Sequence, residues 1–321
     1  ILKQIFDSGE FILSMQNKDL PAQAGEKSKA FGAFHYSYFL DTKEKEEYYV
    51  TGTTAKTIFT LLELYKITGE DRYLTAAKLG ADWLVSMQKE DGKMISYRVY
   101  RDGEWFLSKK YSLLYDGQAL SAFSRLYDIE KEEKYYKAAE KIAQNFAELV
   151  ENEGCYVGDD YRTKNPISSS WVVLSLLDFY KISGEDLYKN IVFQCSNDFL
   201  KRQITKDGDV INHGRWQEAF STSGVGWIME VTTEIYHFCK EQEREDCDKY
   251  KEAALRAIRW LVQNTYSKEN TWFLKNPAMA QGGLFWNERN KYVRTDSVAH
   301  ALNGYLRIIN DLPEGLLLSL D

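Results

Sequence analysis

Residues 64–73 read LYKITGEDRY, and residues 179–188 repeat them closely as FYKISGEDLY. A looser copy, LYDIEKEEKYY, occupies residues 126–136. Each copy joins an apolar stretch with helical spacing to a charged stretch that opens with tyrosine. The repeat predicts a succession of helical hairpins, because internal periodicity of this length is typical of stacked supersecondary units.

The apolar periodicity predicts two sets of helices. A more apolar inner set is expected at Thr53–Ile67, Gly117–Ile129, Ser170–Ile182, Gly226–Cys239 and Ser297–Ile309. A more charged outer set is expected at 1–16, Arg72–Gln88, Glu133–Val150, Asp186–Gln203 and Asp248–Thr265. In the short turns, Gly69 is expected to end one helix and Asp71 to cap the next. The stretch QKEDG at 88–92 resembles the end of squalene-cyclase repeats and is interpreted as a helix end followed by a turn.

The connections between these helices are unequal in length. Inner-to-outer turns are short, whereas outer-to-inner connections are long, and long loops in a compact domain are usually functional. The lone outer helix at the start and the lone inner helix at the end would close a ring of five hairpins, or of six if a helix precedes Ile1 or lies within 20–40. We expect one all-α domain over 1–321, an (α/α)5 to (α/α)6 toroid. The alternative is an open right-handed helical array.

Composition limits the class of protein. The 321 residues are 44% hydrophobic and 28% charged, with a net charge of −7. An acidic chain disfavours a nucleic-acid partner, which needs a basic face, and no apolar run reaches the roughly 20 residues that span a bilayer. We therefore expect a soluble protein with no nucleic-acid or membrane partner, in the cytoplasm rather than exported, although a leader removed before Ile1 would leave no trace. The oligomeric state stays open.

Neither a cofactor nor a metal is expected. The four cysteines lack the spacing of a zinc site and are interpreted as buried or incidental thiols. A bridge between Cys239 and Cys247, which flank one predicted turn between helices, is the alternative.

Acid and base candidates lie in the long loops. Asp116, in YDGQAL, stands immediately before an inner helix, where it would be an N-cap, a catalytic group or both. Asp159 lies in the third loop, with a solvated turn as the alternative interpretation. The stretch HGRWQEAFSTSGVG at 213–226 adds His213 and Glu218, and a charged loop around a buried tryptophan would also explain it.

Two reaction types remain open for these four candidates. Glycoside hydrolysis needs two carboxylates in different environments, which Asp116 with Glu218 or Asp159 would provide. A base such as His213 or Tyr49 would instead remove a proton beside a carboxylate, which is epimerase or lyase chemistry. Sequence spacing does not choose between them.

The same loops are rich in aromatic and basic residues. Flat rings with polar rims suit the faces of sugars, although many of these rings would simply bury the loops. Asp296 matches Asp116 on the last inner helix, and Arg162, Arg215 and Arg294 are expected to clamp a carboxylate. The predicted substrate-binding residues are Tyr49, Trp105, Arg162, Trp171, Arg215, Trp216, Trp286, Arg294, Asp296 and His300.

The hairpin repeats together with LYDGQALSAFSRLY at 114–127 resemble the six-hairpin glycosidase superfamily, in particular unsaturated uronyl hydrolases. The resemblance implies a catalytic aspartate at Asp116 and hydration of a vinyl ether in an unsaturated uronide. The second aspartate of those hydrolases has no match here, because Thr51 and Gly52 stand where it is expected.

More distant resemblances are to the C-terminal domains of glucuronyl C5-epimerases and to toroidal polysaccharide lyases. We thus expect a carbohydrate-active enzyme for an acidic oligosaccharide or polysaccharide, most simply a glycoside hydrolase. A uronyl C5-epimerase or polysaccharide lyase is the first alternative. A non-catalytic glycan-binding toroid is the second, and its sign would be a pocket whose carboxylates all pair with Lys or Arg.

Overall fold

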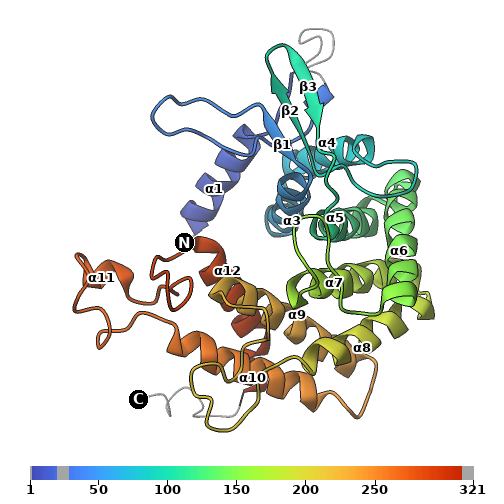
Figure 1. Ribbon diagram of the computed structural model, residues 1–321. Helices are drawn as coiled ribbons and strands as arrows, with labels where there is room; N and C mark the ends of the chain where they lie inside the picture. The colour runs from blue at the N-terminus through green and yellow to red at the C-terminus, as the bar shows by residue number, and fades with distance from the viewer. Residues whose placement is uncertain (1, 20–28, 313–321) are drawn as a thin grey trace. The chain divides into compact units, whose positions relative to one another are not determined.

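The computed structural model describes residues 2–19 and 29–312, and most of them are helical (Figure 1). The elements are α1 (Leu2–Ser14), β1 (Tyr48–Val50), α3 (Thr51–Thr68), α4 (Asp71–Ser86), β2 (Tyr97–Arg101), β3 (Glu104–Leu107), α5 (Leu113–Glu130), α6 (Glu133–Glu153), α7 (Pro166–Ser183), α8 (Asp186–Leu200), α9 (Thr222–Glu241), α10 (Asp248–Gln263), α11 (Pro277–Ala280), α12 (Thr295–Ile308) and η2 (Ile309–Asp311). Each predicted helix is present, and the inner helices begin two to four residues earlier than predicted. A further helix was considered possible within 20–40. Residues 29–40 hold no α-helix, and residues 20–28 lie outside the described ranges.

The chain divides into two compact units. Unit 1 comprises residues 1–154, 158–163 and 174–192, and unit 2 comprises 155–157, 164–173 and 193–321. Both α7 and α8 contribute residues to each unit. The single domain therefore stays a prediction, and each unit is described by itself below.

The short turn between α3 and α4 shows how the repeated sequence folds. Gly69 has a left-handed backbone with φ of 69°, and its N–H donates to the Tyr65 carbonyl at 2.7 Å, which confirms the glycine stop. The predicted cap at Asp71 is wrong. Asp71 is the first helical residue, and Glu70 occupies the N-cap position without a side-chain cap bond. The Thr68 hydroxyl instead accepts the Glu70 N–H at 3.1 Å.

A glutamine clamp recurs where three outer helices end. The side-chain amide of each glutamine donates to a glycine carbonyl in its own loop and to an alanine carbonyl in the next outer helix, at 2.8–3.1 Å. The three sets are Gln16 with Gly32 and Ala76, Gln88 with Gly92 and Ala138, and Gln203 with Gly214 and Ala253. The helix end and turn predicted at 88–92 is therefore also a joint between successive hairpins.

Two loops of unit 1, the one before α3 and the one between α4 and α5, together form a small antiparallel sheet, of order β1-β2-β3, that sequence reasoning missed (Figure 1). Strands β2 and β3 are joined by Asp102 and Gly103, whose φ values are 53° and 86°. Positive φ at both central residues is what a tight hairpin turn needs, and Asp-Gly is the sequence most favourable to it. The Asp-Gly pair was therefore the feature of the sequence that could have indicated this hairpin.

All four cysteines are bridged, so the interpretation as free thiols is wrong. Cys155 pairs with Cys195, and Cys239 pairs with Cys247, with Cα atoms 5.0 Å and 5.6 Å apart. The second bridge closes the turn between α9 and α10, as the alternative foresaw. Nothing in the sequence linked the first pair, whose members are 40 residues apart. Within the described ranges, no helix is both long and apolar enough to cross a membrane.

Candidate functional site

Asp116 lies inside unit 1 rather than at its surface. Helix α5 begins at Leu113 with Ser112 as its N-cap residue, so Asp116 belongs to the first turn and the N-cap prediction is wrong. The side chain is 0% exposed, and its Oδ1 accepts the Met94 N–H at 3.0 Å. Burial raises the pKa of Asp116 to about 8, although the Met94 N–H and the Tyr111 hydroxyl both act to lower it. The carboxyl is therefore protonated at neutral pH.

In two other inner helices the fourth residue also accepts a hydrogen bond from the preceding loop. Thr54, the fourth residue of α3, accepts the Phe34 N–H at 3.2 Å, and Ser169, the fourth residue of α7, accepts the Val157 N–H at 3.1 Å. Asp116 is the fourth residue of α5 and binds its loop in the same way. The bond to the loop is thus a repeated structural task, and the carboxyl group is what distinguishes Asp116.

Asp159 holds the start of α5. Its Oδ2 accepts the Leu113 N–H at 2.9 Å and the Ser112 hydroxyl at 3.3 Å. Its Oδ1 accepts the N–H groups of Tyr161 and Arg162 at 2.9 Å and 2.8 Å. Both oxygens are occupied by structural bonds, so Asp159 is not a solvated turn residue.

Glycine at position 52 explains why no second aspartate is present beside Asp116. A Cβ atom at Gly52 would lie 2.3 Å from Oε1 of Gln118 and 2.4 Å from Cδ1 of Tyr115. A side chain at position 52 would therefore require Tyr115 and Gln118 to move. The position that the uronyl hydrolase resemblance assigns to an acid is therefore filled by the neighbouring helix α5.

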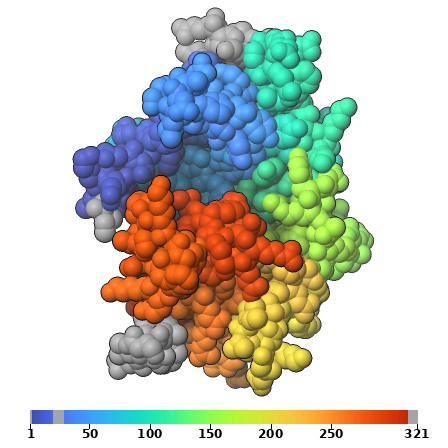
Figure 2. Space-filling model, turned by 60° about the vertical axis from the view of Figure 1, so that its left-hand side comes forward, coloured from blue at the N-terminus to red at the C-terminus, as the bar shows by residue number. Residues whose placement is uncertain are grey.

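Five tyrosines of unit 1 lie near the N-terminal ends of α3 and α5. Ring centroids are 5.3 Å apart for Tyr36 and Tyr48, 5.1 Å for Tyr48 and Tyr97, and 6.4 Å for Tyr115 and Tyr161. Burial, and then the neighbouring phenols, raise the pKa of Tyr48. We call these five residues the tyrosine cluster, and as neutral phenols they offer rings and hydroxyls of the kind that bind sugars. The segments at 29–50 and 97–107, which carry three of the five, are the blue and teal parts of the upper half of Figure 2.

The other predicted binding residues of unit 1 differ in their exposure to solvent. Tyr49 is 0% exposed and donates to a carboxylate oxygen of Glu47 at 2.8 Å, so it is not presented to a ligand. Trp105 is half-buried, with its ring 6.1 Å from that of Tyr49 and 5.1 Å from that of Tyr100. Arg162 is exposed.

In unit 2, two of the predicted residues have structural partners. Trp216 is 0% exposed and donates from Nε1 to the Phe199 carbonyl at 3.0 Å, so it cannot contact a ligand. Glu218 forms an ion pair with Arg202 at 2.8 Å, and that guanidinium also stacks over the Tyr156 ring at 3.8 Å. Because its carboxylate is already engaged by this guanidinium, Glu218 is less available to a substrate, which disfavours it as a catalytic group.

Arg294 already has a carboxylate partner. Its Nε and Nη2 bind the two oxygens of Asp296 at 2.8 Å and 2.7 Å, and the guanidinium lies 4.4 Å from the centre of the Trp286 ring. Asp296 lies in the first turn of α12 rather than before it. Burial acts to raise the pKa of Asp296, but the bond to Arg294 and its charge, with the Ser297 N–H and the charge of His300, together lower it. This pair opposes the predicted use of Arg294 as a clamp for a ligand.

A histidine–carboxylate pair, the His300–Glu230 dyad, joins α12 to α9. Nδ1 of His300 lies 2.8 Å from Oε2 of Glu230, whose other oxygen accepts the Asn303 amide at 3.2 Å. The two side chains are 17% and 16% exposed, so both are within reach of solvent. Glu230 was missed in the sequence, because nothing there connects residues 70 positions apart.

Two stacked tryptophans lie beside this dyad. The ring of Trp227 is 5.3 Å from that of His300, and it stacks on Trp171 at 4.0 Å with an interplanar angle of 18°. The Trp227 indole N–H donates to the Ser170 hydroxyl at 3.0 Å, which fixes the ring. Trp171 was predicted to bind substrate, and at 4% exposed it acts as the support of Trp227.

The dyad is better suited to proton transfer than the other histidine candidate. A carboxylate at Nδ1 fixes the tautomer and the orientation of the imidazole ring. Among the described residues, Nε2 of His300 has no hydrogen-bond partner and is available to a substrate. Nδ1 of His213, in contrast, lies 3.4 Å from the Lys206 carbonyl, and no carboxylate among the described residues orients its ring.

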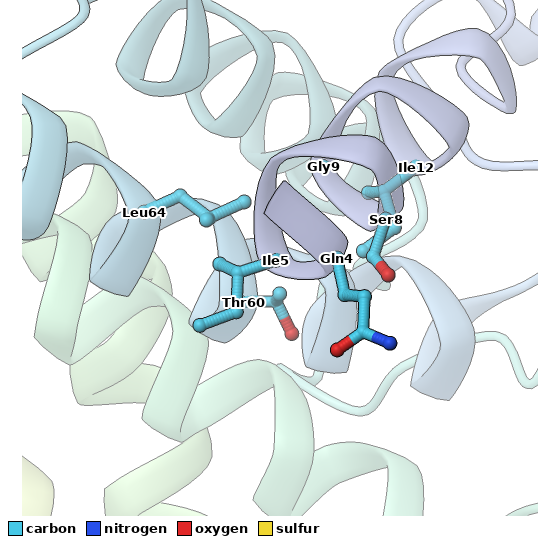
Figure 3. A pocket seen from close by; sticks show the side chains of 7 residues that line it. All are labelled: Gln4, Ile5, Ser8, Gly9, Ile12, Thr60 and Leu64. Carbon is cyan, nitrogen blue, oxygen red and sulfur yellow. The ribbon is translucent and has the colours of Figure 1, made fainter. Parts of the chain in front are cut away.

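One cavity of unit 1, about 280 Å³ in volume, lies between α1 and α3 and is unsuited to chemistry (Figure 3). Its lining is mostly apolar and holds no titratable group. The residues are Gln4, Ile5, Ser8, Gly9, Ile12, Thr60 and Leu64.

Similarity to solved structures confirms the fold class. A sugar epimerase from a ruminal bacterium is 13% identical, with a TM-score of 0.63 over 93% of this chain and 78% of that one. Cellobiose 2-epimerase from Spirochaeta thermophila is 15% identical, with a TM-score of 0.59 over 88% and 76%. A family 76 glycoside hydrolase, an α-mannanase from Bacteroides thetaiotaomicron, is 16% identical, with a TM-score of 0.57 over 82% and 71%.

At these identities the similarity extends to the fold alone, which is an (α/α) toroid. No family model matches the sequence, and no curated protein matches it.

Proposed function

We propose that the protein is a carbohydrate-active enzyme that moves a proton at a carbon atom of a sugar, an epimerase-type or isomerase-type reaction, with His300 as the general base. The observation that carries this proposal is the 2.8 Å contact between His300 Nδ1 and Glu230, which leaves Nε2 for the substrate. Two of the structurally similar proteins above are named as sugar epimerases. The fold is therefore compatible with such chemistry.

In the proposed reaction, His300 Nε2 takes a proton from a sugar carbon next to a carbonyl or carboxylate group. The C–H bond breaks, an N–H bond forms, and the electron pair delocalises onto the neighbouring oxygen as an enolate. Glu230 stabilises the imidazolium that results. The protonated His300 then returns the proton to the adjacent carbon on the same face or, after the enolate has turned in the site, to the opposite face of the first carbon. In both cases the product is an isomer of the substrate.

A glycoside hydrolase ranks second. The raised pKa of Asp116, about 8, favours it, because hydrolysis needs an acid that is protonated at neutral pH. It also needs a second, ionised carboxylate. Asp159 is engaged by backbone N–H groups and Glu218 by Arg202, and Asp116 itself is 0% exposed. A hydrolase would therefore require this part of unit 1 to open.

The two functions differ in the mass of the product. We suggest incubating the enzyme with aldoses, reducing disaccharides, and saturated and unsaturated uronides, and analysing the products by chromatography, mass spectrometry and NMR. The proposal predicts a product of unchanged mass. Cleavage of a glycosidic bond, or addition of water to an unsaturated uronide, would favour the hydrolase instead.

Substitution of His300 tests its role once a substrate is known. His300→Asn should lower kcat about 10²–10⁴-fold, the usual contribution of a general base. His237→Asn is the matched control, because His237 lies on α9 with its Nε2 2.7 Å from the Arg307 carbonyl and takes no part in the dyad. Comparable activity in wild type and His300→Asn would overturn the assignment.

A further inference from the structure

A groove of about 470 Å³ lies in unit 2 between the loop before α9 and the turn at 287–290. Its lining residues are Asn212, Arg215, Phe220, Trp260, Asn287, Glu288 and Arg289. The two walls are tied together by Thr222, whose N–H donates to the Trp286 carbonyl at 2.9 Å and whose hydroxyl donates to the Phe285 carbonyl at 3.0 Å. The loop before α9 is yellow and the segment that carries the turn is orange-red on the face shown in Figure 2.

Arg215 carries a partly buried charge that has no ion-pair partner among the described residues. Its Nε donates to Asn212 Oδ1 at 2.8 Å, and its Nη1 donates to the Trp216 carbonyl at 3.0 Å. These bonds fix the plane of the guanidinium without neutralising it. Burial lowers the pKa of Arg215, and the more distant Asp209, Glu288 and Glu218 only oppose this effect. An unpaired, partly desolvated cation is a strong attractor for an anion.

The remaining lining residues suit a sugar. Phe220 is 65% exposed, and the Arg215 guanidinium lies over its ring, 5.0 Å from the ring centre, so exposed apolar surface adjoins the cation. Arg289 adds a second positive charge, and Glu288 is the one acidic residue in the lining. The lining therefore has an excess of positive charge in a chain whose net charge is −7.

We propose that this groove binds the carboxylate of an acidic sugar, with Arg215 as the anion-binding group and Phe220 beneath the sugar ring. The inference rests on the proposed function for the class of ligand, but it uses none of the residues of the His300–Glu230 dyad. It would make the substrate, or a neighbouring unit of it, a uronate.

Binding can be measured without turnover by isothermal titration of the full chain with tri-galacturonate, and with maltotriose as a neutral trisaccharide. We expect wild type to prefer tri-galacturonate and to lose affinity as salt is raised. Arg215→Gln should weaken tri-galacturonate binding at least tenfold, Arg215→Lys should weaken it less, and Phe220→Ala should weaken it too. Arg259→Gln, at an exposed position of α10, is the matched control and should bind as wild type.

Three results would overturn the inference: no binding of tri-galacturonate by wild type, equal affinity in Arg215→Gln, or tighter binding of inorganic sulfate, which would assign the groove to a simple oxyanion. His300→Asn should bind tri-galacturonate as wild type does. If it does so while wild type turns over no sugar, the proposed function fails and the groove stands. If sugars are turned over and the groove binds no uronate, the proposed function stands and the inference about the groove fails.

Discussion

Asp116 is the fourth residue of its helix, a position where two other inner helices carry a hydroxyl group. Like those hydroxyls it accepts an N–H of the preceding loop, but its carboxyl group can also titrate. Thr54 and Ser169 hold their loops with neutral oxygens, whereas Asp116 does so with a carboxyl whose pKa burial raises to about 8. A neutral carboxyl group can replace a hydroxyl group at this position with little loss of folded-state stability. Its ionisation inside unit 1 would be unfavourable.

This environment makes stability depend on pH. In the unfolded chain the pKa of an aspartate is about 3.9, so between about pH 4 and 8 the folded state retains a proton that the unfolded state has lost. The stabilisation is complete below pH 4 and is lost as pH rises toward 8, by up to about 1.4 kcal/mol per pH unit. Asp116→Asn, which stays neutral, should flatten this dependence in urea unfolding between pH 5 and 8. Equal slopes in the two proteins would show that Asp116 is ionised in the fold.

Asp159 is expected to matter for stability rather than for chemistry. Replacing it by alanine removes the acceptor of Leu113, Tyr161 and Arg162 N–H groups, and should lower the free energy of unfolding by about 1–3 kcal/mol. Thermal unfolding would measure this, with Asp207→Ala at an exposed loop position as the control. A variant of Asp159 that is as stable as wild type but inactive would return it to the catalytic candidates.

At the scale of single residues, the sequence predicted where candidates lie better than what they do. Asp116, Asp159 and Glu218 were selected because they are acidic and precede inner helices. Their partners come from other segments, such as the Met94 N–H and the Arg202 guanidinium, and no local pattern shows those partners. Glu230 was missed for the same reason, since it lies in the middle of an apolar helix.

At the scale of elements, the glutamine clamp is the joint between successive hairpins. Gln88→Ala would leave the Gly92 and Ala138 carbonyls without their donor, which should lower the free energy of unfolding by about 2–4 kcal/mol. Gln194→Ala, at an exposed position of α8, should change it by less than about 0.5 kcal/mol. Urea unfolding of both variants would test this, and equal effects would show that the clamp is not a specific joint.

Gly214, the glycine of the third clamp, is required both for its positive φ and for its close approach to α10. Comparing alanine substitutions at Gly214 and Gly208 separates these two effects. Gly214 has φ of 99°, and a Cβ there would meet the Arg256 carbonyl oxygen at 2.1 Å. Gly208 has φ of 87° with nothing within 4 Å of that position. Gly208→Ala should therefore cost about 1 kcal/mol from backbone strain alone, and Gly214→Ala several times more. Similar melting temperatures for the two variants would contradict the close approach to α10.

Helices were predicted more reliably than their ends or the sheet. The periodicity located every inner helix, but the first turns at Thr51, Leu113 and Pro166 bind loops and so lack the periodic pattern. Strands β2 and β3 are short, and their aromatic residues resemble those of the surrounding loop. Only Asp102 and Gly103 marked the hairpin.

At the scale of the whole molecule, two disulfides constrain the unfolded chain unequally. The Cys155–Cys195 bridge joins residues 40 positions apart and the Cys239–Cys247 bridge residues 8 apart. Loop-closure entropy then predicts that the first bridge stabilises by about 1.4 kcal/mol more than the second. Urea unfolding of the two double Cys→Ser variants would measure the difference. A larger loss from the 239–247 variant would contradict this account.

The bridges also bear on the environment of the protein. Disulfides persist chiefly in oxidising compartments, and the cytoplasmic location expected from the sequence stays a prediction. The fold class, in contrast, could be predicted from repeats alone, because each hairpin carries its own copy of the pattern. The chemistry could not, because the dyad depends on one contact between α9 and α12.

The most direct test of the proposed proton transfer is deuterium incorporation. Wild type would be incubated with each sugar of the panel in D2O, and exchange at carbon would be followed by NMR and mass spectrometry. The account predicts that wild type and His237→Asn place deuterium at a carbon beside the carbonyl or carboxylate of at least one sugar, and that His300→Asn does so about 10²–10⁴-fold more slowly. Turnover of a sugar without such incorporation, or equal exchange by His300→Asn, would contradict it.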